Sequence, residues 1–233
     1  MNDSNYRYQG REMTRTARPY ALRALAVSAF LAISAPSVSA HPHIFADARL
    51  EIETDAKGNI AELRNVWRFD EVFSSSVVMD FDSNKNATMD PDELHRVAQV
   101  VTDSLSDYNY FVSLTDNGKD IKVDPPKAMV ANYDDGQLLL IFAVEPAQPV
   151  KLDGMVKVGI YDPTMYTAID FMNDGDLVVT GPDAAKCGTQ VVRPDPDEVL
   201  EQNQASLTEA FFNDPAGTDL SKLFATRIEL DCK

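Results

Sequence analysis

The sequence contains little cysteine and little histidine. Of its 233 residues, only two are cysteine and three are histidine. The cysteines, Cys187 and Cys232, lie too far apart in the sequence to form a local metal-binding clip. Because histidine is so scarce, the sequence provides few candidates for a general base or for a cluster of nitrogen ligands. No internal repeat or low-complexity linker is present either, which excludes a repeat protein.

Basic residues are also scarce. The chain has 21 lysines and arginines against 37 acidic residues, a net charge of −16. Five of the arginines and two of the acids lie within residues 1–40, so the remainder has 16 basic and 35 acidic residues, a net charge of −19. Such a surface repels phosphate backbones and anionic lipids, which excludes nucleic-acid binding and membrane adhesion. Small cations are the natural ligands, although acidic side chains also serve solubility.

Long hydrophobic runs are absent. The apolar stretch ALAVSAFLAISA at 24–35 is shorter than the roughly 20 residues that span a bilayer. Three arginines precede it, and Val38 and Ala40 occupy the small-residue positions of a cleavage site. We therefore expect a signal peptide at 1–40 and a free, soluble periplasmic protein with no stable membrane insertion; an uncleaved anchor is the alternative. No cysteine near the cut indicates a lipid anchor.

Export places both cysteines in an oxidising compartment. We expect Cys187 and Cys232 to form a disulfide that ties the last strand to the rest of the domain. Closing a loop of this length stabilises a fold by roughly 3–4 kcal/mol in the chain-entropy model.

The remaining chain, 41–233, is expected to form one α+β domain, with a mainly antiparallel, sandwich-like sheet. Residues 43–53 alternate between apolar and polar, which predicts a half-buried strand, and 60–69 is its expected hairpin partner. The other predicted strands are 138–144, 155–161 and 225–231, with hairpin signals DNG at 116–118, DDG at 134–136 and NDG at 173–175.

Helical periodicity replaces strand alternation in two places. At 70–106, Phe73, Val77 and Phe81 recur every four residues, and a second three- and four-residue pattern starts at Leu94. This predicts an inserted helix-loop-helix. A C-terminal helix is expected at 196–212, with Asp195 as its N-cap.

The loop between the two inserted helices reads DSNKNATMDPDE at 82–93. A calcium loop of twelve residues needs hard oxygen ligands at fixed places. The predicted calcium ligands at those places are Asp82, Asn84, Asn86, Thr88 through its backbone carbonyl, Asp90 directly or through water, and Glu93 in bidentate fashion. The segment resembles an EF-hand.

Ala87 departs from the EF-hand pattern because it stands where such loops have glycine. A Cβ opposes the left-handed conformation of this place by about 1 kcal/mol. Since two ligands are neutral amides, we expect a dissociation constant on the order of 10⁻⁵ to 10⁻³ M and a structural role. The alternative is an Asx-rich connection that binds nothing.

Cleavage after Ala40 gives a mature chain that begins His41-Pro42-His43. The terminal amine and two imidazoles are ligands that suit zinc, nickel or copper. Pro42 lacks the N–H that a square-planar amino-terminal site deprotonates. Asp47, on the strand face of His43, and His95 are further candidate ligands; the alternative is an inert tail.

Enzymatic readings have less support. The run SSS at 74–76 lies on a helical pattern without the strained turn of a nucleophile elbow. A copper oxidase based on the terminal amine and His41 needs a remote histidine, for which only His95 is available. We therefore expect a binding protein, not an enzyme.

Several stretches together resemble one bacterial family: HPHIFAD, WRFDEVFSS before the acidic loop, VGIYDPTMY and the late cysteines. Its members are labelled the periplasmic component of an uncharacterised ABC-type transport system. The resemblance implies an inner-membrane permease of the nickel, cobalt and zinc type as partner, with His41 and His43 at the metal. A calcium-stabilised structural or interaction module without transition-metal handling is the second hypothesis.

Overall fold

A long antiparallel hairpin forms the centre of the first sheet. The computed structural model describes residues 43–182, 184–213 and 221–232. Strands β1 (Ile44–Thr54) and β2 (Ile60–Phe69) pair with Ala46 opposite Phe69. Alternate residues of β1 from Ala46 to Thr54 are buried, because successive side chains of a strand point to opposite faces. The predicted hairpin and its buried face are confirmed.

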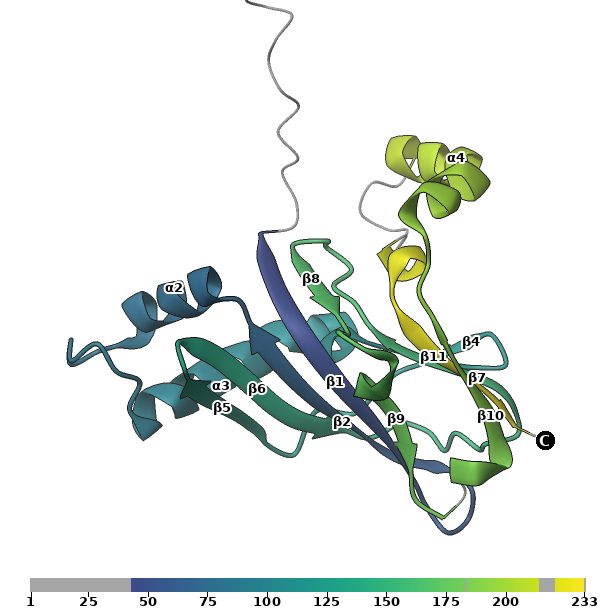
Figure 1. Cartoon of the computed structure of the whole chain (residues 1–233), viewed down its shortest axis with the longest axis horizontal. Helices are drawn as coiled ribbons and strands as arrows, with labels where there is room; N and C mark the ends of the chain where they lie inside the picture. Colours follow the sequence, from purple (N-terminus) through teal and green to yellow (C-terminus); the bar gives the residue numbers. More distant parts are fainter. Residues whose placement is uncertain (1–42, 183, 214–220, 233) are drawn as a thin grey trace, which may run out of the picture. The chain divides into compact units, whose positions relative to one another are not determined.

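The first sheet has the strand order β5-β6-β2-β1-β8, and β9 also pairs with β1 (Figure 1). Its additional strands are β5 (Met129–Asp134), β6 (Gln137–Val144), β8 (Thr167–Asp170) and β9 (Leu177–Thr180). Strands β5, β6 and β2 are antiparallel to their neighbours, whereas β8 and β9 run parallel to β1. The DDG turn at 134–136 joins β5 to β6 as predicted.

The hairpin predicted at NDG 173–175 is wrong. Residues Asp174–Asp176 form a short 3₁₀ turn, η2, between β8 and β9, which pair with different parts of β1. The Asp176 carboxylate accepts a hydrogen bond from the Asn173 N–H at 2.9 Å, which closes this turn locally. Asn and Asp therefore favour a capped turn here, and the chain continues in the same direction.

The second sheet has the order β10-β11-β7-β3-β4. Its strands are β3 (Val112–Asp116), β4 (Lys119–Ile121), β7 (Gly154–Ile160), β10 (Cys187–Val192) and β11 (Arg227–Cys232). The DNG signal joins β3 to β4 as predicted. Cys187 and Cys232 lie directly opposite each other on β10 and β11 and form the expected disulfide.

The described helices agree with the predicted ones. They are α2 (Glu71–Phe81), α3 (Pro91–Leu105) and α4 (Pro196–Asn213). Short 3₁₀ turns are η1 (Ser106–Phe111), η3 (Ala184–Lys186) and η4 (Ser221–Phe224). The Asp195 carboxylate accepts from the Asp197 N–H at 2.9 Å, as an N-cap does. The fold is α+β and mostly antiparallel, as predicted.

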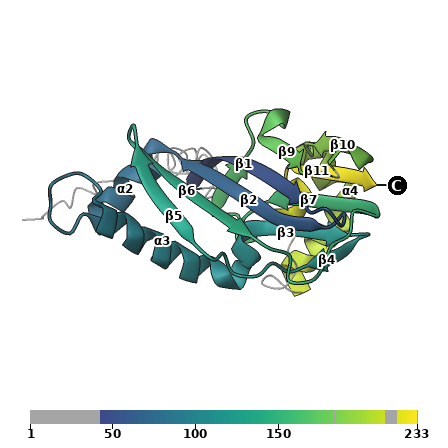
Figure 2. The ribbon, with the colours of Figure 1, turned by 90° about the horizontal axis from the view of Figure 1, so that it is seen from below.

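Figure 2 shows α2 and α3 along one face of the first sheet. Buried residues of this sheet and of β7 and β11 in the second sheet belong to the same core cluster, for example Trp67, Leu140, Val158 and Leu230. The described residues, from His43 onward, form one compact unit. The signal peptide at 1–40 lies outside the described residues and stays a prediction. Within the described residues, no helix is both long and apolar enough to cross a membrane.

Asp70 joins three elements where β2 ends. Its Oδ1 accepts from the Phe73 N–H at 2.9 Å and caps α2, while its Oδ2 accepts from the Phe45 N–H of β1 at 2.9 Å. The Asp70 N–H in turn donates to the Phe45 carbonyl at 2.9 Å. One residue thus fixes the start of α2 against the start of β1.

Ser74 extends this junction to β6. Its hydroxyl is fully buried, donates to the Asp70 carbonyl at 2.6 Å and accepts from the Leu138 N–H at 2.9 Å. A buried backbone N–H without an acceptor is costly, so this serine serves α2 and β6 together. The neighbouring Ser75 is exposed and its hydroxyl bonds only within the helix, to the Glu71 carbonyl.

We predict that Ser74→Ala lowers the free energy of unfolding by about 1–3 kcal/mol, because the Leu138 N–H loses its acceptor. Urea unfolding followed by the fluorescence of Trp67, the single tryptophan, measures the change. Ser75→Ala is the matched control and should change stability by less than about 0.5 kcal/mol. Equal effects of the two substitutions would contradict the assigned role of Ser74.

Candidate functional site

The loop between α2 and α3 brings several predicted calcium ligands together. Asn84 Nδ2 lies 2.6 Å and Asn86 Nδ2 lies 3.2 Å from the same oxygen, Asp90 Oδ2. The third, fifth and ninth places of the loop therefore meet at one carboxylate. A half-turn of either terminal amide presents its oxygen in place of its nitrogen. This set of carboxylate and amide oxygens has the hard-donor chemistry that calcium requires.

Asp82 shapes the backbone of the loop. Its two carboxylate oxygens accept from the Asn86 N–H at 3.2 Å and the Ala87 N–H at 2.8 Å. Ala87 has φ of 60° and Lys85 has φ of 61°, both in the left-handed region. The sixth place therefore takes the conformation predicted for it, although alanine carries a Cβ there.

Glu93 closes the loop, and its contacts differ from those of a bidentate ligand. Its side chain is buried; Oε1 accepts from the Ser83 N–H and hydroxyl, both at 2.8 Å, and Oε2 accepts from the Asp90 N–H at 3.0 Å. The Asp90 N–H, followed by the Ser83 hydroxyl and N–H, lowers the pKa of Glu93 from its ordinary value. An ionised Glu93 thus links the two ends of the loop.

Hydrogen bonds also hold Thr88, although they do not involve its carbonyl, which is the predicted ligand atom. Thr88 donates through its N–H and its hydroxyl to Asn86 Oδ1, at 2.8 and 2.7 Å. Among the described residues, no three His, Cys, Asp or Glu side chains gather so that they could hold a metal ion. Asn84, Asn86 and Asp90 are therefore close and of suitable chemistry, whereas the carboxylates of Asp82 and Glu93 do not join them. A cation there has to replace hydrogen bonds inside the loop.

The histidines are not brought together in the described part of the chain. His41 lies outside the described residues. The His43 N–H donates to the Tyr166 carbonyl at 2.9 Å, and the two rings lie 4.9 Å apart. Asp47 is exposed on the same face of β1, and His95 Nε2 lies 3.1 Å from Gln99 Nε2 on α3. The predicted transition-metal site stays a prediction, because its first ligand is not described.

The segment YDPTMY lies beside His43, a proximity that sequence spacing did not indicate. Asp162 is buried and accepts from the Thr164 N–H at 2.8 Å, the Thr164 hydroxyl at 2.7 Å and the Thr167 N–H at 2.9 Å. These bonds fold the loop that carries Tyr166. The sequence analysis assigned no function to this segment. In the structure, its Tyr166 carbonyl holds the start of β1.

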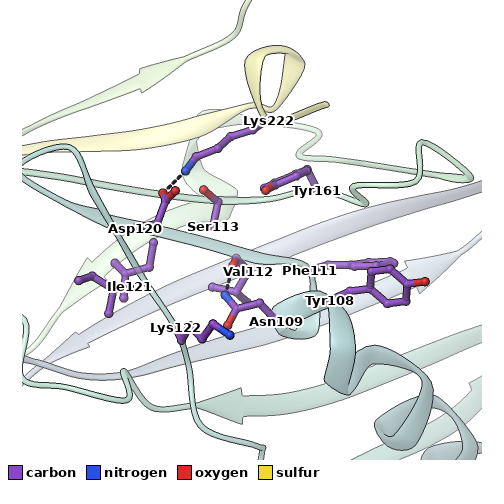
Figure 3. Close-up of a pocket in the computed structure, with 11 residues that line it drawn as sticks. Tyr108, Asn109, Phe111, Val112, Ser113, Asp120, Ile121, Lys122, Tyr161 and Lys222 are labelled. Atoms are coloured by element: carbon purple, nitrogen blue, oxygen red, sulfur yellow. Dashed lines mark hydrogen bonds and ion pairs between the residues drawn. The ribbon is translucent and has the colours of Figure 1, made fainter. Parts of the chain in front are cut away.

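A hollow of about 440 Å³ lies between η1, β3 and β4 (Figure 3). The Lys222 ammonium and the Asp120 carboxylate form an ion pair at its wall. Tyr108 and Phe111, at the other side, contact each other with ring centroids 6.1 Å apart. This hollow was missed by sequence reasoning because it is assembled from 108–122, Tyr161 and Lys222.

An unusual backbone forms the edge of this hollow. Asn109, Tyr110 and Phe111 all have positive φ, at 53°, 53° and 59°. The Asn109 amide supports the turn: its Nδ2 donates to the Val112 carbonyl at 2.6 Å, and its Oδ1 accepts from the Val123 N–H at 2.9 Å. Three consecutive left-handed residues without glycine are strained, and surrounding contacts must maintain them. The segment has no glycine to signal the turn.

Fold and loop together define an α+β protein whose inserted helix-loop-helix carries a candidate cation site. The chain belongs to the family described as protein of unknown function (DUF1007), which matches residues 26–232. No curated protein matches the sequence. A solved structure of Capitella teleta AChBP in complex with lobeline covers 94% of this chain and 100% of its own, at 11% identity and a TM-score of 0.29. That likeness is too weak to carry an argument.

The left-handed conformation of Ala87 can be tested by substitution. We predict that Ala87→Gly raises the free energy of unfolding by up to about 1 kcal/mol, because it removes a Cβ from a left-handed residue. Urea unfolding measures the change. The control Ala56→Gly lies in an exposed turn without positive φ and should lower stability by about 0.4–1 kcal/mol. If both substitutions changed the free energy of unfolding in the same direction, the strain assigned to Ala87 would be contradicted.

Proposed function

We propose that this protein is a periplasmic accessory protein that binds metals without catalysing a reaction. In this proposal the loop at 82–93 binds calcium and holds α2 and α3 in place. The processed amino end binds zinc, nickel or cobalt through His41 and His43 and delivers the ion to an inner-membrane permease. The observation that carries the calcium part is the meeting of Asn84, Asn86 and Asp90 in a loop with a left-handed sixth residue.

The chemistry of the loop supports a structural role for calcium. Asp82 is the C-cap residue of α2 and Asp90 is the N-cap residue of α3. An ion shared by these two residues restrains both helix ends at once. Because the chain has one such loop and two of its ligands are neutral amides, the proposed affinity suits a compartment with abundant calcium.

The amino end and the transport partner rest on residue chemistry and on the family resemblance. His43 is exposed at the start of β1, where residues that precede it in the chain can add nitrogen ligands. The disulfide between Cys187 and Cys232 suits an oxidising compartment, which supports the periplasmic location. The permease is proposed as a partner only because of the family resemblance.

The second candidate is a calcium-stabilised interaction module without transition-metal handling. It is favoured by the contact between His43 and Tyr166, which gives that imidazole a packing role. In this candidate, the hydrogen-bonded loop at 161–167 serves to hold β1, and calcium is the only metal bound. Binding of transition metals to the mature protein separates the two candidates.

Calcium binding predicts an increase in stability. With a dissociation constant of about 10⁻⁴ M, calcium at 100 times that concentration raises the free energy of unfolding by about 2.7 kcal/mol. Urea unfolding with calcium, with magnesium and with a chelator measures this. Glu93→Gln should remove most of the calcium increment, whereas Asp92→Asn, which removes the same charge from the adjacent exposed position, should retain it. Equal stabilisation by magnesium would contradict a calcium site.

Transition-metal binding is tested on the secreted protein after its first residue has been sequenced. Isothermal titration should show one zinc or nickel ion bound per chain, and substitution of His41 and His43 together by alanine should abolish the heat of binding. His95→Ala is the control and should bind as the wild type does. Undiminished binding by the double variant, or no binding by the wild type, would contradict transition-metal binding at the amino end. The calcium-stabilised interaction module would then be the better candidate.

A further inference from the structure

An apolar cavity of about 330 Å³ lies between α2, α3 and the first sheet. On α2 its lining residues run from Phe73 to Phe81, and on α3 from Val97 to Leu105, each at the spacing of one helix face. Both helices therefore turn their apolar faces toward the same space. Its volume falls within the range of small-molecule pockets, roughly 300–1,000 Å³.

The first sheet forms the closed side of the cavity, and its open side lies between α2 and α3. Its floor contains Trp67, Leu138 and Leu140, each 1% exposed. Val100 on α3 is 47% exposed, and Asp80 on α2 is exposed, so these two residues mark the mouth. A ligand that enters between the helices therefore meets a polar edge first and aromatic and aliphatic side chains further in.

Trp67 is a fixed part of the floor. Its indole Nε1–H is buried and has no acceptor among the described residues. Phe111 stacks on the ring at a centroid distance of 6.0 Å and Phe142 meets it edge-on at 4.9 Å, so the ring is held in place. Because the ring lines the cavity, the indole resonance reports on a ligand bound there.

Charge at the mouth selects among ligands. Asp80 is the one ionisable side chain among the described residues that line the cavity, and no described residue forms an ion pair with it. The chain carries a net charge of −16. An anionic ligand is therefore repelled, while a cation gains a partner at the mouth. Aromatic side chains of the lining also favour a cation over an anion.

We propose that this cavity binds a hydrophobic amine. The apolar body of the ligand lies between α2 and α3 against the Trp67 ring, and its ammonium pairs with Asp80 at the mouth. This site uses none of the proposed metal ligands, so it can be tested separately from the proposed function.

Tetracaine is a suitable probe because it joins an aryl ester to a tertiary ammonium. The acid part of the same molecule, 4-(butylamino)benzoate, is the matched anion. Isothermal titration of the mature protein, with calcium and with a chelator, should show binding of tetracaine and at least tenfold weaker binding of the anion. The single indole N–H resonance in a ¹⁵N-labelled sample should shift on tetracaine binding.

Three variants locate the site. Asp80→Asn should weaken tetracaine binding about two- to fivefold, the range of an exposed ion pair. Val100→Phe narrows the mouth without changing the floor and should weaken binding at least tenfold. Val72→Phe, on an 83% exposed residue of α2 outside the cavity, is the control and should bind as the wild type does.

Three results would overturn the proposal. Equal affinity for tetracaine and for 4-(butylamino)benzoate would contradict the role of Asp80. Unchanged binding by Val100→Phe, with its fold verified by urea unfolding, would place the ligand elsewhere. An unmoved indole resonance at saturation would mean that the ligand does not lie against Trp67.

Discussion

The carboxylate of Asp70 is the contact on which the arrangement of this protein depends. One oxygen caps α2 and the other accepts from β1, so a single side chain sets where the helix pair begins relative to the central hairpin. Ser74 adds β6 to the same junction. Since α2 leads directly into the loop at 82–93, the position of the candidate calcium site follows from this junction. The floor of the apolar cavity, built from β2 and β6, follows from it too.

The loop illustrates how chemistry suited to a cation also serves the bare polypeptide. Asp82 satisfies two backbone N–H groups of the turn, and Glu93 satisfies groups at both ends of the loop. These bonds stabilise the left-handed backbone at Ala87 against its Cβ. A calcium ion would exchange some of these bonds for stronger coordination, which is a physical reason for the modest affinity proposed.

Periodicity in the sequence was sufficient for most elements. The alternation of β1, the four-residue spacing of α2 and the cap at Asp195 are local signals, and the structure confirms each. NDG at 173–175 was misread because the same residues favour a hairpin and a capped turn, and only pairing with β1 distinguishes them. The left-handed residues at 109–111 have no local signal, because contacts from distant residues such as Val123 maintain them.

By itself, the sequence determined the α+β class, the spacing of polar side chains in the loop at 82–93 and the acidic character, because these depend on neighbouring residues or on composition. It also determined the disulfide partners, because the chain has only two cysteines. Only the tertiary structure decided that YDPTMY contacts His43 and that Glu93 links the two ends of the loop. It also decided that Asp80 and Trp67 lie in one cavity. Such contacts depend on how the chain crosses between two sheets and two helices, and the periodicity of one segment does not specify that path.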